Sequence, residues 1–85
     1  MLTAAQMKAA RALLGMEQKM LAELSGVSLP TIQRMEASNG VVRGVIETLM
    51  KVMGALEAAG IEFINEAAVS SGGGRGVRLR HPNNR

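Results

Sequence analysis

Residues 18–35, QKMLAELSGVSLPTIQRM, constrain the fold most, because they predict two short helices joined by a tight turn. Gly26 stands in the middle of the turn and supplies the positive φ angle that the turn needs. Ala22 is small, which allows the second helix of the pair to pack across the first. The side chains expected to fill the wedge between the two helices, and to close it from below, are Val27, Ile32 and Met35.

Capping residues and glycines predict where the other helices begin and end. Thr3 is expected to cap a first helix, with Gln6 as its capping-box partner, and Gly15 is expected to end it. Ser28 is the expected cap of the third helix, and Pro30 lies in its first turn, where the missing N–H costs nothing. The second, third and fourth helices are expected at about residues 17–25, 29–37 and 43–59.

Apolar spacing predicts which helix faces are buried. Side chains three and four residues apart share one face of a helix. The second helix is expected to place on one side Met20, Leu21 and Leu24. The apolar stripe of the fourth helix consists of Ile46, Leu49, Met50, Met53 and Leu56.

After Gly60 the apolar period changes from that of a helix to that of strands. Residues 61–64 and 76–80 are expected to be two short strands, joined through a loop that is rich in Ser and Gly at residues 70–74. The predicted fold class is therefore mainly α, with four or five helices followed by a C-terminal strand pair. The predicted division is a helical domain at residues 1–60, a β-hairpin at 61–80 and a flexible tail at 81–85.

Composition excludes several kinds of site. The chain has no Cys and one His, His81, so disulfides and zinc sites built from Cys or several His are excluded. Phe63 is the only aromatic residue, which argues against stacking platforms for single-stranded bases. No catalytic constellation and no membrane-spanning stretch is found, so we expect no enzyme activity, no cofactor, no metal and no membrane partner. The location expected for such a chain is the cytoplasm.

Eight residues of the helical region follow the pattern of a known family. Gln18, Leu21, Ala22, Gly26, Val27, Ser28, Ile32 and Glu36 stand as in the phage-repressor-like (Cro-type, XRE) helix-turn-helix regulators. The chain resembles this family over about residues 3–59. The resemblance implies that the helix at residues 28–37 enters the major groove of double-stranded DNA.

The resemblance also implies roles for single residues. Family members contact phosphates at the positions of Gln18, Ser28 and Arg43. Lys19 is a further candidate, although a Lys at such a position is more often a solvated helix residue than a specific contact. The exposed part of the recognition helix consists of Leu29, Pro30, Thr31, Gln33 and Arg34. Gln suits adenine and Arg suits guanine, whereas Leu29 and Pro30 suit thymine methyl groups. Arg11 and Glu36 resemble a pair that forms a buried salt bridge between the first and third helices, and Ala22, Gly26 and Ile32 are structural.

A single module of this kind buries little surface on DNA, so we expect a homodimer that binds an inverted-repeat operator. A strand pair is marginal alone, and pairing with the same strands of a second chain would remove its open edges. The predicted dimer interface consists of Met50, Met53, Leu56, Ile61, Phe63, Ile64, Val77 and Leu79.

The predicted function is sequence-specific binding of double-stranded DNA by a bacterial or phage-type transcriptional regulator, most simply a repressor. Two alternatives remain open at this point. One is an antitoxin that also binds a toxin, and the other is a protein–protein adaptor that does not bind DNA. A regulatory protein partner is compatible with each of these functions.

The positive charge of the chain is concentrated near its end. Residues 1–66 contain six basic and seven acidic side chains, whereas residues 67–85 contain four Arg and no acid. The helical region is therefore not basic overall, and its affinity for DNA must come from a few placed groups.

Overall fold

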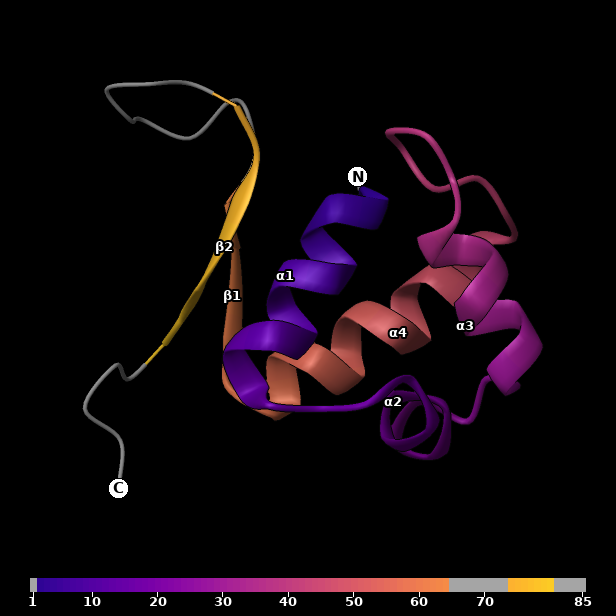
Figure 1. The fold of residues 1–85 in the computed structure, drawn as a ribbon, viewed down its shortest axis with the longest axis horizontal. Helices are drawn as coiled ribbons and strands as arrows, with labels where there is room; N and C mark the ends of the chain where they lie inside the picture. Colours follow the sequence, from indigo (N-terminus) through magenta and orange to yellow (C-terminus); the bar gives the residue numbers. More distant parts are fainter. Residues whose placement is uncertain (1, 65–73, 81–85) are drawn as a thin grey trace.

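Four helices are followed by a pair of antiparallel strands (Figure 1). The computed structural model describes residues 2–64 and 74–80, so the expected tail at 81–85 and nearly all of the loop at 70–74 lie outside it. The elements are α1 (Ala4–Leu14), α2 (Gln18–Ser25), α3 (Leu29–Glu36), α4 (Ile46–Ala58), β1 (Ile61–Ile64) and β2 (Gly76–Leu79). The mainly helical fold with a C-terminal strand pair is confirmed.

The predicted capping residues set the ends of the first three helices. Thr3 accepts a hydrogen bond from the Gln6 amide, and the Gln6 side chain accepts one from the Thr3 amide, which completes the capping box. Gly15 ends α1 and Gly26 ends α2, both in the left-handed conformation with φ of 64° and 72°. Ser28 caps α3. The ends of these helices are therefore set by residues that are close to each other in the sequence.

The start of α4 differs from the prediction. The helix begins at Ile46 rather than Arg43, and Val45 is an extended N-cap residue without a side-chain hydrogen bond. Gly44 is a poor helix former, and Val is β-branched, so residues 43–45 gain little from helical conformation. The extended segment forms the connection from α3 to α4, and it leaves Arg43 outside the helix.

One hydrophobic core unites the helices and the strands. Its fully buried side chains of larger volume are Leu2, Met7, Leu21, Ile32, Val52, Leu56 and Ile61. Val27 and Met35 are also buried, as predicted for the wedge between α2 and α3. Of the three apolar residues expected on one side of α2, Leu21 is fully buried, whereas Met20 and Leu24 are about half exposed. The helix is too short and too close to the surface to bury more than the Leu21 side.

The strand pair packs beside α1, on the side away from α3 (Figure 1). Ile61 lies opposite Leu79 and Phe63 opposite Val77, so these apolar side chains share one face. Phe63, Val77 and Leu79 pack against the core. On the other face Glu62 lies opposite Arg78, and the two form an exposed ion pair with Nε–Oε1 of 3.1 Å.

A buried glutamine connects α1 to both strands. The Nε2 amide of Gln6 donates to the Gly76 carbonyl at 3.1 Å and to the Ile64 carbonyl at 3.4 Å. Gln6 is only 3% exposed, so these bonds satisfy an amide that would otherwise be buried without a partner. The strand pair is thereby attached to the helical region. No helix within the described residues is long and apolar enough to cross a membrane.

Candidate functional site

The outer face of α3 is the first part of the candidate site. Pro30, Gln33 and Arg34 are exposed, and Leu29 and Thr31 are half-buried. The opposite face consists of Ile32, Met35 and Glu36, which are buried. The helix therefore presents both polar, hydrogen-bonding side chains and apolar side chains to the solvent, while its inner face is packed in the core.

The first turn of α3 is held by its cap. The Ser28 hydroxyl accepts a hydrogen bond from the Thr31 amide at 3.3 Å and donates one to the Thr31 hydroxyl at 2.9 Å. Thr31 therefore has a capping contact, and its hydroxyl retains donor capacity for an external acceptor. Both side chains lie at the N-terminal end of α3, where backbone N–H groups favour an anion.

A buried ion pair fixes the other end of α3. Glu36 is 5% exposed, and its carboxylate accepts two hydrogen bonds from Arg11, from Nε at 2.7 Å and from Nη2 at 2.6 Å. The hydrogen bond with Glu36 raises the pKa of Arg11, although partial burial of the guanidinium opposes the shift. Arg11 also donates from Nη1 to the Met16 carbonyl at 3.0 Å. The salt bridge implied by the family resemblance is present, and it joins α1, α3 and the connection to α2.

Gln18 belongs to the same network. Its Nε2 amide donates to Oε1 of Glu36 at 3.0 Å, which connects the start of α2 to the end of α3. The family resemblance implied a phosphate contact for Gln18, and the sequence did not reveal this hydrogen bond to Glu36. The amide oxygen of Gln18 forms no hydrogen bond within the described residues, so it remains free as an acceptor.

Two arginines flank a hollow between α3 and the start of α4. The hollow is lined by Thr31, Arg34, Met35, Arg43, Gly44, Val45, Thr48 and Leu49. Arg34 and Arg43 are both exposed, and neither forms an ion pair within residues 2–64 and 74–80. Lys19, at the start of α2, is exposed as well. The structure thus brings Arg34 and Arg43 together, although nine positions separate them in the chain.

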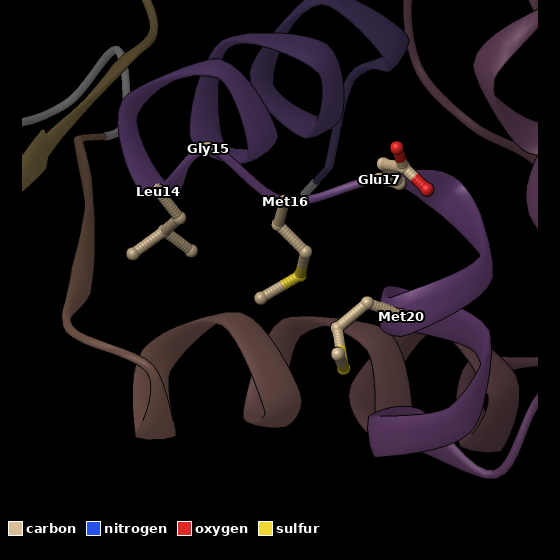
Figure 2. Close-up of a pocket in the computed structure, with 5 residues that line it drawn as sticks. All are labelled: Leu14, Gly15, Met16, Glu17 and Met20. Carbon is tan, nitrogen blue, oxygen red and sulfur yellow. The ribbon is translucent and has the colours of Figure 1, made fainter.

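A second hollow lies on another part of the surface (Figure 2). It has a volume of about 400 Å³, and its lining consists of Leu14, Gly15, Met16, Glu17 and Met20. Figure 2 shows the side chains of Leu14, Met16 and Met20 directed toward the space above α4. Glu17 is its only ionisable lining residue, so this hollow offers no acid–base pair. No cluster of metal-ligating side chains is found in the part of the chain that the structure describes.

The residues predicted for a dimer interface fall into three groups by burial. Leu56 and Ile61 are fully buried in the core of a single chain, so they present no surface to a partner, and their predicted interface role is corrected. Their apolar character is explained by burial in the core of their own chain. Met53, Phe63, Val77 and Leu79 are partly buried against the same core, and Ile64 is half-buried. Met50 differs from all of these, because 61% of it is exposed.

Comparison with protein families finds a match to the helical part of the chain. Residues 7–41 match the protein family described as Helix-turn-helix. The matched segment includes most of α1, all of α2 and α3, and the loop that follows α3. It therefore includes the capped α3 helix and the whole Arg11–Gln18–Glu36 network. No curated protein matches the chain closely enough to count as a relative.

Proposed function

We propose that this chain binds double-stranded DNA sequence-specifically, with α3 in the major groove. The premise is that the chain is a DNA-binding transcription regulator, with a helix-turn-helix of the Cro-type (XRE) family at residues 7–41. The observation that supports this proposal best is the exposed side of α3. Its polar side chains face outward, while Ile32, Met35 and the Glu36 network hold the inner side of the helix.

Base contacts are assigned to the outer face of α3. Gln33 can donate to and accept from adenine, and Arg34 can donate two hydrogen bonds to guanine. Leu29 and Pro30 offer apolar contacts for thymine methyl groups, and Thr31 can use its remaining hydroxyl proton. Each good bidentate pair discriminates by about 1–3 kcal/mol against the wrong base. Specificity therefore rests mainly on Gln33 and Arg34.

Phosphate contacts are assigned to groups at the edges of α3. Ser28 and the N-terminal amides lie at one end of α3. Gln18, which precedes Lys19 at the start of α2, contacts Glu36 at the other end of α3. Arg43 lies beside Arg34 across the hollow between α3 and α4. Residues 1–66 contain six basic and seven acidic side chains, so the non-specific electrostatic attraction between this region and DNA is weak. These placed contacts set the register of α3 on the duplex.

The biological unit of this proposal is a homodimer that binds an inverted repeat. Two recognition helices of a dimer lie roughly 34 Å apart, one turn of DNA, and a twofold axis makes the two half-sites symmetric. A dimer that occupies a promoter blocks polymerase, so repression is the simplest regulatory outcome. The cytoplasm is the compartment in which such a regulator would meet DNA.

The test is selection of bound duplexes from a random pool by the full-length chain. The proposal predicts recovery of an inverted repeat, with a recurring half-site that contains guanine and adenine. The Arg34→Ala variant should relax selection at the guanine, while a Lys8→Ala control on the exposed side of α1 should recover the same sequence. A pool without any enriched sequence, from wild-type protein at low salt, would contradict the proposal.

A further inference from the structure

The outer side of α4 contains a row of uncharged residues that its own chain leaves uncovered. Ile46 and Met50 are each 61% exposed, although both are large and apolar. Gly54 and Ala58 follow at intervals of one turn, and both are exposed. Residues four apart form a continuous ridge on a helix surface. We refer to Ile46, Met50, Gly54 and Ala58 as the α4 ridge.

Gly54 has no explanation within its own chain. Glycine in the middle of a helix is destabilising relative to alanine, because it loses more backbone freedom on folding. A Cβ atom at this position would meet nothing within 4 Å, and its φ is not in the left-handed region. Neither packing nor backbone conformation therefore requires glycine here. A close approach of a second backbone from outside would require it.

Charge along the α4 ridge favours one occupant. Lys51 lies three residues before Gly54 and Glu57 three residues after it, and both are exposed. If two copies of α4 cross antiparallel at Gly54, Lys51 of one copy lies at the level of Glu57 of the other. A parallel crossing would instead bring like charges to the same level. The ridge is thus complementary to itself in an antiparallel crossing, which is one of the arrangements that twofold symmetry allows.

We propose that the α4 ridge is the contact with a second copy of this chain, with two α4 helices crossing antiparallel near Gly54. This inference rests on the proposed function, which needs a symmetric dimer. The hollow lined by Arg34 and Val45 shows that α3 lies directly beside the start of α4. A twofold axis at the ridge therefore keeps both recognition helices near that axis.

The strand pair is the competing surface for the same dimer. Its apolar face packs against the core, and its other face contains the exposed Glu62–Arg78 ion pair. Backbone groups at the strand edges and the half-buried Ile64 remain for pairing. The strands also lie on the side of α1 away from α3, so a dimer through them would move the recognition helices far from the twofold axis (Figure 1).

Sedimentation equilibrium of the full-length chain tests this surface directly. Wild-type protein should dimerise, and Met50→Asp should raise the dimer dissociation constant by at least about tenfold, because it places a charge in the centre of an apolar contact. Leu13→Asp is the matched control, since Leu13 is an exposed apolar residue on α1, outside the ridge. It should leave the dissociation constant within about twofold of wild type.

Gly54→Leu adds a test in which two readouts change in opposite directions. Leu is a better helix former than Gly. At protein concentrations below the dimer dissociation constant, the monomer of Gly54→Leu should therefore have a higher Tm than the wild-type monomer. The same side chain should block the close crossing and weaken the dimer by at least about tenfold. Unchanged dimerisation in both Met50→Asp and Gly54→Leu would overturn the proposal, as would wild-type protein that remains monomeric at every concentration.

A single half-site duplex separates this inference from the proposed function. Monomeric Met50→Asp should bind one half-site as tightly as a wild-type monomer, because α3 is unchanged. Absence of any duplex binding by wild-type dimers would contradict the DNA function and leave the interface intact. If half-site binding is intact while Met50→Asp and Gly54→Leu both dimerise like wild type, only the role of the α4 ridge as the dimer contact would be contradicted.

Discussion

Replacing Arg11 with Met is expected to destabilise the fold strongly, because the buried carboxyl group of Glu36 would lose its ion-pair partner. The Glu36 side chain is 4% exposed and that of Arg11 19%. Removing one partner of a buried pair costs about 3–5 kcal/mol. The lower end applies here, since the Gln18 amide still donates to Glu36 at 3.0 Å. A loss of about 3 kcal/mol corresponds to a decrease in Tm of roughly 12–24 °C in a domain of this size.

Urea denaturation followed by far-ultraviolet circular dichroism measures this loss, and the helical signal serves because the chain has no Trp. Protein concentration is held fixed, since dimerisation would contribute to stability. Lys8→Met is the control, because it removes an exposed charge from the same helix and should change stability by less than about 0.5 kcal/mol. The double variant Arg11→Met with Glu36→Leu should recover most of the loss, since no unpaired charge remains. A loss below about 1 kcal/mol in Arg11→Met, or no recovery in the double variant, would refute this reasoning.

Three further predictions concern the turn, the strand pair and the DNA contacts. Gly26→Ala should cost about 1–2 kcal/mol, measured by urea denaturation, because φ of 72° strains any residue with a Cβ atom; a neutral result would contradict the turn geometry. Arg78 lowers the pKa of Glu62 through a hydrogen bond to its carboxylate. The contribution of this pair to folding stability is therefore present above the ordinary Glu pKa and is lost as pH falls through the lowered pKa. An NMR titration should find the Glu62 midpoint shifted up in Arg78→Ala, and an unchanged midpoint would show that the pair is absent in solution. Arg43→Ala should weaken binding to all duplexes alike and reduce the salt slope by about 1 per protomer; a change confined to one sequence would instead indicate a base contact.

The local features of the fold could be predicted because each depends on neighbours in sequence. The capping box at Thr3, the left-handed Gly26 and the Ser28 cap involve residues no more than four apart. The start of α4 was less predictable. Gly44 and Val45 follow Arg43, and the apolar helical pattern does not exclude either of them from the helix, although the helix begins only at Ile46. Short-range signals therefore fix helix ends well only where a capping side chain is present.

Long-range contacts were harder to predict. The hydrogen bonds from Gln6 to the carbonyls of Ile64 and Gly76 span 58 and 70 positions of the chain, and no local sequence pattern indicates them. Leu56 and Ile61 have the apolar character of interface residues, but the sequence does not say whether the same chain or a second one covers them. Met50 has the same character and lies outside the core. Only the packing of α4 against the rest of the chain separates these cases.

The most direct test of the central claim is the affinity of wild-type protein for its selected inverted repeat relative to an unrelated duplex. Fluorescence anisotropy with labelled duplexes at physiological salt gives both dissociation constants. Specific binding by α3 predicts a ratio of at least about 10³. The Gln33→Ala and Arg34→Ala variants should each lose about 1–3 kcal/mol on the selected site only. Equal affinity for the two duplexes, or a ratio unaffected by both substitutions, would contradict recognition of DNA sequence by α3.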